Sequence, residues 1–307
     1  MYASTRQRLK SLLESPELTI APGVYDGISA RVVEEMGFKT AVITGAGVSN
    51  SRLGQPDFGI LNLSENAAQS GMIADTVDIP VQADADTGYG NAVNVYHTVK
   101  TFEKAGVDCV MIEDQKFPKR CGHMAGKEVI PMEEMCGKVE AAVEARDETD
   151  PDLCIKARTD AAGPLGIDEA IRRLNAYADL GADIVFADAI QTKEEIEQLC
   201  SEVDAHVSVN MGFGIRERPT TPLVSPSDLE DAGAAMVSYP RLITASAIRG
   251  MYDALETLQV SADDGEIHER PDQVIAWSQF MELMDQPSLS ELEMRFAPED
   301  VTVSGHD

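Results

Sequence analysis

Three acidic residues follow two successive apolar segments of the sequence. Asp84 and Asp86 end the first, and Glu113 ends the second. Residues two apart on a strand point to the same face, so both aspartates are expected to face one way. Three carboxylates without a neighbouring His or Cys pair favour Mg²⁺ or Mn²⁺ over Zn²⁺. The alternative, that acidic residues cap helix N-termini, applies better to Asp114 and Asp160.

A single arginine accompanies these acids. Arg158 lies between the apolar run Cys154–Ala157 and Thr159. Its guanidinium either pairs with the acidic residues or binds an anionic substrate through a two-pronged contact, and both can hold in different states. A metal and an arginine beside the small residues Thr44–Gly47 would form a receptor for the carboxylate of an oxyacid.

The segment PKRCGHMAGKEVIP, Pro118–Pro131, shows neither helix nor strand periodicity. Cations beside Cys121 should lower its pKa and favour the thiolate, and the glycines would let the segment move as a lid. The alternative is a basic phosphate-binding loop in which the thiol is incidental. The other cysteines are expected to be inert, in apolar strands or on helices: Cys109, Cys154, Cys136 and Cys200.

The elements that carry these residues repeat. The segments EEMGFKTAVITG, EKAGVDCVMIED, ADLGADIVFADA and EDAGAAMVSYP each end a helix at a glycine and continue into an apolar run. Further strands are expected at Leu18–Pro22, Ile79–Ala83, Cys154–Ala157 and His206–Val209. Eight such runs alternating with helices predict an α/β fold, a (β/α)8 barrel, because nearly every run ends in a polar group and a barrel gathers these ends at one mouth. A doubly wound open sheet is the alternative, but a G-x-G-x-x-G segment after the first strand is absent.

Composition limits the partners. The 307 residues carry a formal charge of -28, which would repel nucleic acid and anionic membranes. The scattered acids favour adaptation to high salt over an acidic recognition surface. Five cysteines without a secretory segment, and no apolar run long enough to span a membrane, predict a cytoplasmic protein. The expected organisation is a barrel domain over residues 1–260 and a helical extension over 261–307.

Five motifs occur in the order of a known superfamily. TGAGVSNSRLGQPDFG, DADTGYG, EDQ…PKRCGH, ARTD and Asn210-Met211 resemble, across residues 18–260, the isocitrate lyase / phosphoenolpyruvate mutase superfamily. The stretch from Lys119 to His123 resembles its lyase branch; mutases, phosphonate hydrolases and oxaloacetate decarboxylases generally lack that cysteine. The resemblance implies cleavage of a carbon–carbon bond in a 2-hydroxy acid.

The resemblance also implies roles for individual residues. Asp84, Asp86 and Glu113 would hold Mg²⁺, directly or through water, and Mg²⁺ would chelate the substrate hydroxyl and carboxylate. The implied substrate-binding residues are Thr44, Gly45, Ala46, Asp57, Arg158, Asp188 and Asn210. The implied catalytic residues are Cys121, Tyr89, His123, Lys119 and Arg120. Among these, Cys121 would protonate the carbanion and Tyr89 is a candidate base.

Two departures bear on the substrate. Asp188 stands where the family has a glutamate after the sixth strand. Methylisocitrate-type lyases tend to carry an Asn-Met-x-Glu stretch, but this chain reads NMGFGIRERPTTPLV, which lacks that glutamate and contains Arg216 and Arg218. The two arginines either bind an additional substrate carboxylate or offset the acidic residues of the chain. We expect isocitrate, cleaved to glyoxylate and succinate, with 2-methylisocitrate or 2,3-dimethylmalate as alternatives. Cys121 argues against oxaloacetate decarboxylase or phosphonomutase chemistry, and the intact set of site residues argues against a non-catalytic metabolite-binding barrel.

The segment Pro271–Phe296 contains the single tryptophan, Trp277, and several large apolar residues. These helices can fold back on their own barrel or pack on that of a neighbour. In the superfamily that the chain resembles, C-terminal helices are exchanged between the subunits of a tetramer. The resemblance therefore implies a homotetramer.

Overall fold

The computed structural model describes residues 4–120, 126–216 and 221–297. It divides into two compact units, Met1–Ser246 and Ala247–Asp307. The division falls inside helix α11 (Leu242–Asp264), earlier than the expected boundary at residue 260.

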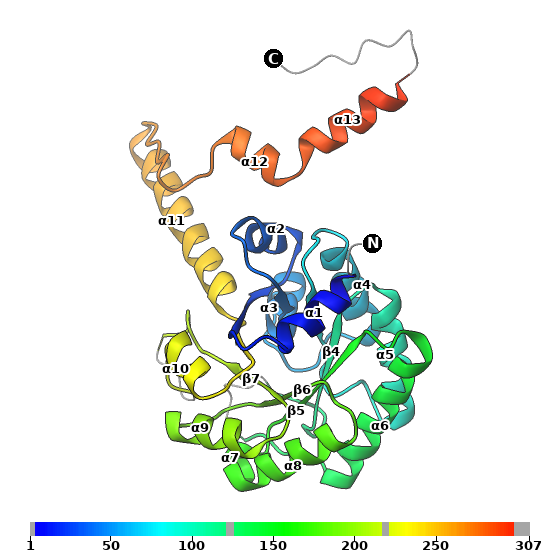
Figure 1. The fold of residues 1–307 in the computed structure, drawn as a ribbon. Helices are drawn as coiled ribbons and strands as arrows, with labels where there is room; N and C mark the ends of the chain where they lie inside the picture. Colours follow the sequence, from blue (N-terminus) through cyan, green and yellow to red (C-terminus); the bar gives the residue numbers. More distant parts are fainter. Residues whose placement is uncertain (1–3, 121–125, 217–220, 298–307) are drawn as a thin grey trace. The chain divides into compact units, whose positions relative to one another are not determined.

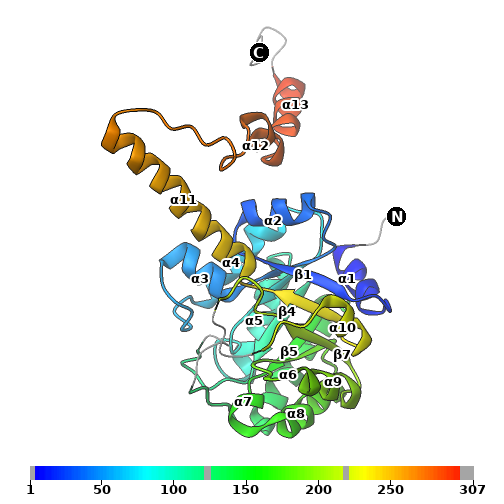
Figure 2. The ribbon, with the colours of Figure 1, turned by 90° about the vertical axis from the view of Figure 1, so that its left-hand side faces the viewer.

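Eight parallel strands close into a barrel in the order β1 to β8, with β8 pairing back onto β1. Helices surround the strands of the first unit (Figures 1 and 2). The strands are β1 (Thr19–Val24), β2 (Ala41–Ile43), β3 (Val81–Asp84), β4 (Cys109–Glu113), β5 (Cys154–Thr159), β6 (Ile184–Ala187), β7 (His206–Asn210) and β8 (Met236–Tyr239). The predicted (β/α)8 barrel is confirmed.

The helices of the first unit alternate with these strands. They are α1 (Thr5–Leu13), α2 (Gly27–Glu35), α3 (Gly45–Leu53), α4 (Leu63–Ala74), α5 (Ala92–Lys104), α6 (Met132–Thr149), α7 (Ala162–Leu165), α8 (Ile167–Asp179), α9 (Lys193–Glu202) and α10 (Pro226–Asp231). Side-chain oxygens cap several of their N-termini; Asp26, for example, accepts a hydrogen bond from the backbone N–H of Ser29.

The four predicted helix-to-strand joints are present. Gly37, Gly106, Gly181 and Gly233 follow α2, α5, α8 and α10, and all have φ between 82° and 98°. This left-handed conformation ends a helix with little strain when the residue is glycine.

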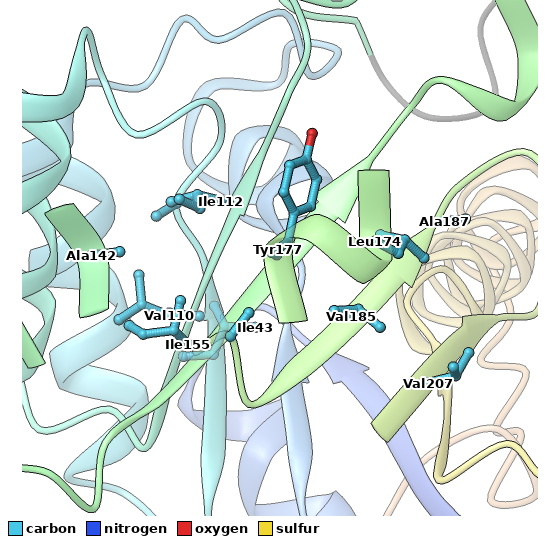
Figure 3. Packing of buried hydrophobic residues seen from close by; sticks show 14 of the residues in the cluster. Ile43, Val110, Ile112, Ala142, Ile155, Leu174, Tyr177, Val185, Ala187 and Val207 are labelled. Carbon is cyan, nitrogen blue, oxygen red and sulfur yellow. The ribbon is translucent and has the colours of Figure 1, made fainter. Parts of the chain in front are cut away.

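The buried apolar side chains form two groups. The larger group lies between the strands and their helices, where Leu174 and Tyr177 of α8 pack among strand residues such as Val185 (Figure 3). The smaller group combines Leu9 and Leu13 of α1 with residues of six strands, including Cys109 and Cys154. The prediction that these two cysteines are packed is confirmed, and burial raises the pKa of Cys154 to about 12.

One strand ends earlier than the site prediction assumed. β3 stops at Asp84, and Asp86 lies beyond it with φ of 49°. The expectation that Asp86 lies on the same strand as Asp84 was therefore wrong. The chain turns after Asp84, and the backbone N–H of Asp86 donates to Asp84 Oδ1 at 3.0 Å.

The second unit contains most of α11 together with α12 (Trp277–Leu283) and α13 (Gln286–Phe296). The rings of Trp277 and Phe280 stack with centroids 5.9 Å apart, yet no residue of α12 or α13 is buried. Within the described ranges, the structure has no helix with the length and apolar character that a membrane span requires.

Candidate active site at the barrel mouth

A cavity of about 60 Å³ opens where the strands end. Since one water needs roughly 10–15 Å³ of such volume, the cavity suits a ligand of few atoms. Most of the predicted substrate-binding residues line it: Thr44, Ala46, Asp57, Arg158, Asp188 and Asn210. Asp84 lines it too, so the predicted gathering of strand-end residues at one mouth is present in the structure.

Arg158 is the centre of a buried ion-pair cluster. Its Nε and Nη2 donate to the two carboxylate oxygens of Asp160 at 2.9 Å each, and Nη2 also donates to Asp188 Oδ2 at 2.7 Å. Nη1 lies 3.2 Å from Glu113 Oε2. The shorter side chain of Asp188 therefore serves as an ion-pair partner of the arginine. The expected pairing of Arg158 with Glu113 is observed, while Asp160 and Asp188 are partners that the sequence had not suggested.

Asp114 fixes the end of β5, on which Arg158 lies. Its carboxylate accepts hydrogen bonds from the Thr159 hydroxyl at 2.6 Å and the Asp160 backbone N–H at 2.8 Å. Arg173 and the Tyr177 hydroxyl donate to it at 2.9 and 3.0 Å. Asp114 thus holds the loop after β5 in place instead of capping a helix.

Lys119 lies in a second buried cluster. Its ammonium is 2.5 Å from Asp86 Oδ1 and 2.7 Å from the carboxylate of Asp57. Burial alone would lower the pKa of Lys119, but Asp86, Glu113, Asp84 and Asp57 outweigh it and hold the pKa well above its usual value. The surrounding carboxylates therefore favour the charged form of Lys119. Burial, opposed by Lys119, raises the pKa of Asp86 to about 7.

Glu113 has the environment of a cation ligand. It is 1% exposed, and neither carboxylate oxygen accepts a well-formed hydrogen bond from a described residue. Burial raises its pKa well above the usual range. In the described part of the chain, no group of three His, Cys, Asp or Glu side chains is close enough to coordinate one ion directly. The two Glu113 oxygens fit Mg²⁺, which commonly keeps several waters and takes only one or two protein carboxylates.

The N-terminus of α3 forms one side of the mouth. Thr44 caps this helix through its side chain, which accepts from the Gly47 N–H at 3.3 Å. A Cβ atom at Gly45 would lie 2.7 Å from Asp84 Oδ2, so the close approach of helix and carboxylate requires glycine there. Backbone N–H groups at such a terminus favour anions.

Tyr89 and Arg120 do not line the cavity, although Asn66 Nδ2 donates both to the Tyr89 hydroxyl and to the backbone O of Asp84, which does line it. Tyr89 has φ of 59°, and its hydroxyl accepts a hydrogen bond from Asn66 Nδ2 at 2.7 Å. Burial first, and Asp86 next, raise the pKa of this phenol well above its usual value, which favours a hydrogen-bond donor over a base. The backbone N–H and C=O of Arg120 both bond to the side chain of Gln115, at 2.9 Å each.

Several predicted residues are not placed by the structure. Cys121, His123 and Arg218 lie outside the described residues. Arg216 is exposed and does not line the cavity.

Three cations of the mouth were not among the predicted site residues, although one of them, Lys127, belongs to the basic segment Pro118–Pro131 that was expected to cover it. Lys127 Nζ lies 2.6 Å from Asp160 Oδ1 and 3.5 Å from Asp188 Oδ2. Arg241 lines the cavity after β8 and donates to Asn50 Oδ1 at 2.9 Å. Lys156 lines it from β5. Lys156 could have been predicted from the sequence, because residues two apart on a strand share a face and Lys156 is two residues before Arg158.

In (β/α)8 barrel enzymes the active site lies at the C-terminal mouth of the barrel. The buried carboxylates and cations at this mouth place the chain in that class. The family model described as phosphoenolpyruvate phosphomutase matches residues 9–259. A 2,3-dimethylmalate lyase of Eubacterium barkeri is 39% identical over 96% of this chain and 99% of its own length. A 2-methylisocitrate lyase of Aeropyrum pernix is 40% identical over 76% of this chain and 72% of its own length.

Solved structures agree with these relatives. A crystal structure of 2,3-dimethylmalate lyase superposes with a TM-score of 0.89 at 30% identity over the full length of both chains. Oxaloacetate acetylhydrolase bound to 3,3-difluorooxalacetate superposes with a TM-score of 0.88 at 32% identity, over 97% of this chain and 99% of its own. The chain belongs to the phosphoenolpyruvate mutase / isocitrate lyase superfamily and is an enzyme.

Proposed function

We propose that this protein is a Mg²⁺-dependent carbon–carbon lyase that cleaves a 2-hydroxy di- or tricarboxylate into a 2-oxo acid and a second carboxylate. The observation that best supports the proposal is Glu113, a buried carboxylate at the barrel mouth whose two oxygens accept no well-formed hydrogen bond from a described residue and whose ion-pair partner, Arg158, also serves Asp160 and Asp188. Such a group is costly to bury unless a cation completes its environment.

Cleavage between C2 and C3 requires the C2 hydroxyl to lose a proton and the C3 fragment to gain one. Mg²⁺ held near Asp84, Asp86 and Glu113, in part through water, would supply Lewis-acid polarisation of the substrate oxygens. Asn210, whose buried Oδ1 accepts no hydrogen bond from a described residue, and the N-terminus of α3 are the proposed polar contacts to the substrate. Cys121 is the proposed donor of the proton to C3.

The relatives guide the choice among substrates. The sequence favours isocitrate, but the relatives from Eubacterium barkeri and Aeropyrum pernix are named for 2,3-dimethylmalate and 2-methylisocitrate. Both acids carry a methyl group on C2 and would release pyruvate, whereas isocitrate would release glyoxylate. We therefore propose a 2-methyl-branched acid first and isocitrate second.

A substrate panel tests the proposal. The purified protein is incubated with Mg²⁺ in molar KCl and with isocitrate, 2-methylisocitrate or 2,3-dimethylmalate. Pyruvate is followed by lactate dehydrogenase and glyoxylate as its phenylhydrazone. We expect one acid to be cleaved, and excess chelator to stop the reaction. Cleavage of none of them, or cleavage that is unaffected by chelator, would contradict the proposal.

A second candidate function is hydrolysis of the C2–C3 bond of oxaloacetate. An oxaloacetate acetylhydrolase bound to 3,3-difluorooxalacetate is among the similar solved structures, at 32% identity and a TM-score of 0.88. Adding oxaloacetate to the panel and measuring oxalate and acetate distinguishes hydrolysis from lyase activity.

A further inference from the structure

Lys156 is a buried cation within the mouth cavity. It precedes Arg158 by two residues on β5, so it lies on the same inward face and one step farther from the C-terminal end of the strand. It is 2% exposed and lines the cavity. Its ammonium donates to Ser208 Oγ at 2.9 Å and lies 5.4 Å from the centre of the Phe186 ring.

Three other cations of the mouth, Arg158, Lys119 and Lys127, already have carboxylate partners. Arg158 is paired with Asp160, Asp188 and Glu113. Lys119 and Lys127 are each paired with two aspartates. Among the described residues, no carboxylate lies within ion-pair distance of Lys156.

We propose that Lys156 determines substrate specificity by binding a carboxylate of the substrate that reaches into the barrel below Arg158. The ligand class is a small acid with at least two carboxylates, one held at the rim and the other at Lys156. This inference rests on the proposed function for its substrate class, but not on cleavage itself.

The charge state of Lys156 supports this role. Burial lowers its pKa to about 8, so at neutral pH the ammonium form predominates about tenfold. A hydroxyl and an aromatic ring compensate a buried charge less well than a carboxylate does. An incoming carboxylate would therefore gain an ion pair in a dry site, where such contacts contribute strongly to selectivity.

The Tm of a Lys156 variant distinguishes substrate binding from a purely structural role of this lysine. Methionine has nearly the length of lysine and no charge, so Lys156→Met should keep the fold and raise Tm while it weakens binding. A lysine that only supports the barrel would give the opposite result, because its loss would lower Tm. Lys10→Met is a control away from the mouth, where Lys10 Nζ donates to Pro151 O at 2.6 Å and lies 3.9 Å from Asp152 Oδ1.

Binding of succinate, oxalate and propionate is measured by calorimetry with Mg²⁺ present, for the wild type, Lys156→Met, Lys156→Gln and Lys10→Met. We expect the two Lys156 variants to lose at least tenfold in affinity for a dicarboxylate and less than twofold for propionate, and Lys10→Met to match the wild type. If the wild type cleaves one of the acids, KM for that acid should rise by a similar factor with a smaller change in kcat.

Direct binding keeps this inference separate from the proposed function, because it can be measured even if the wild type cleaves no acid of the panel. Unchanged dicarboxylate affinity in both Lys156 variants, or a wild type that binds neither dicarboxylate, would overturn the inference. So would a borohydride-trapped adduct of pyruvate or glyoxylate on Lys156, since the amine would then form an imine with the substrate carbonyl instead of an ion pair.

Discussion

At the scale of the residue, Lys156 makes stability depend on pH. Burial lowers its pKa from the ordinary 10.5 to about 8, with Cys109 and Asp84 opposing the change and Arg158 adding to it. Between these two values the unfolded chain binds more protons than the folded one, so the free energy of unfolding rises with pH in this window. The difference corresponds to roughly 3 kcal/mol.

Lys156→Met should remove this dependence. We expect its gain in stability over the wild type to be largest below pH 8 and to shrink as the pH rises toward 10. Urea unfolding followed by circular dichroism across this range measures it, with Lys10→Met as the control. A constant difference between variant and wild type at all pH values would show that the pKa of Lys156 is the same in the folded and unfolded protein, and would contradict the lowered pKa.

Cys121 is the residue on which the proposed proton transfer depends. Cys121→Ser should bind dicarboxylates normally and lower kcat by about 10²-fold or more, the usual effect of losing a general acid. Cys200→Ser is the control, because burial raises the pKa of the Cys200 thiol on α9 to about 11 and leaves it unreactive. A Cys121→Ser enzyme with near wild-type kcat would contradict the proton-transfer role and favour the alternative, a basic phosphate-binding loop in which the thiol is incidental.

At the scale of the element, the N-terminus of α3 packs closely against Asp84 of the site at Gly45. An alanine Cβ at position 45 would lie 2.7 Å from Asp84 Oδ2 and would displace this carboxylate. We expect Gly45→Ala to lower kcat/KM at least tenfold, because the cation site changes, while Tm falls by only a few degrees. Steady-state kinetics and thermal unfolding of the same preparation give both numbers.

Gly137 offers a matched substitution elsewhere. It lies inside α6, and a Cβ there would have no atom within 4 Å. Gly137→Ala should therefore stabilise the protein by up to about 1 kcal/mol through helix propensity and leave kcat/KM unchanged. Equal kinetic losses in both alanine variants would contradict the geometric argument for Gly45.

Periodicity and glycine spacing predicted most of the barrel. The run expected at Cys154–Ala157 is β5, Cys154–Thr159, and that expected at His206–Val209 is β7, His206–Asn210. These patterns are local, because a buried parallel strand is an apolar run and its preceding helix ends at a left-handed glycine. The gathering of polar strand ends at one mouth followed from the topology.

The pairing of charges within the mouth could not be predicted in the same way. Which carboxylate approaches Arg158 depends on side chains from β4, the end of β5 and the loop after β6, whose separation in sequence carries no distance information. The turn that gives Asp86 a positive φ was also hidden, because aspartate adopts this conformation less often than glycine or asparagine and no glycine marks the position. Lys156 was passed over because it interrupts an apolar run.

At the scale of the whole molecule, net charge should control stability. The formal charge of -28 produces self-repulsion that is screened over about 3 Å in molar salt and over about 30 Å at 0.01 M. We expect Tm to rise steadily with KCl. Sucrose of equal osmolality is the control, because it does not screen charge. A Tm independent of KCl would remove the argument for adaptation to high salt.

The C-terminal helices should hold an assembly together. α12 and α13 have no buried residue, and Trp277 is 74% exposed in the single chain. Burying such side chains against a neighbour contributes about 25 cal/mol per Å² of apolar area. We predict a homotetramer in molar KCl, measured by light scattering, and a smaller species for a chain truncated before Pro271. A truncated chain that remains a tetramer of equal stability would contradict this.

The pairing of β1 with β8 also has a consequence for protein synthesis. Thr19 is paired with Met236, and Leu9 and Leu13 of α1 pack with residues of six strands, of which β8 is the last. On the ribosome, the contacts of the first helix and strand with β8 cannot form until the residues of β8 have left the exit tunnel, which takes about ten to fifty seconds at common elongation rates. During that time a nascent chain would expose the inner face of an unclosed sheet, so trigger-factor-like chaperones or slow translation after β8 would favour a high yield of closed barrels.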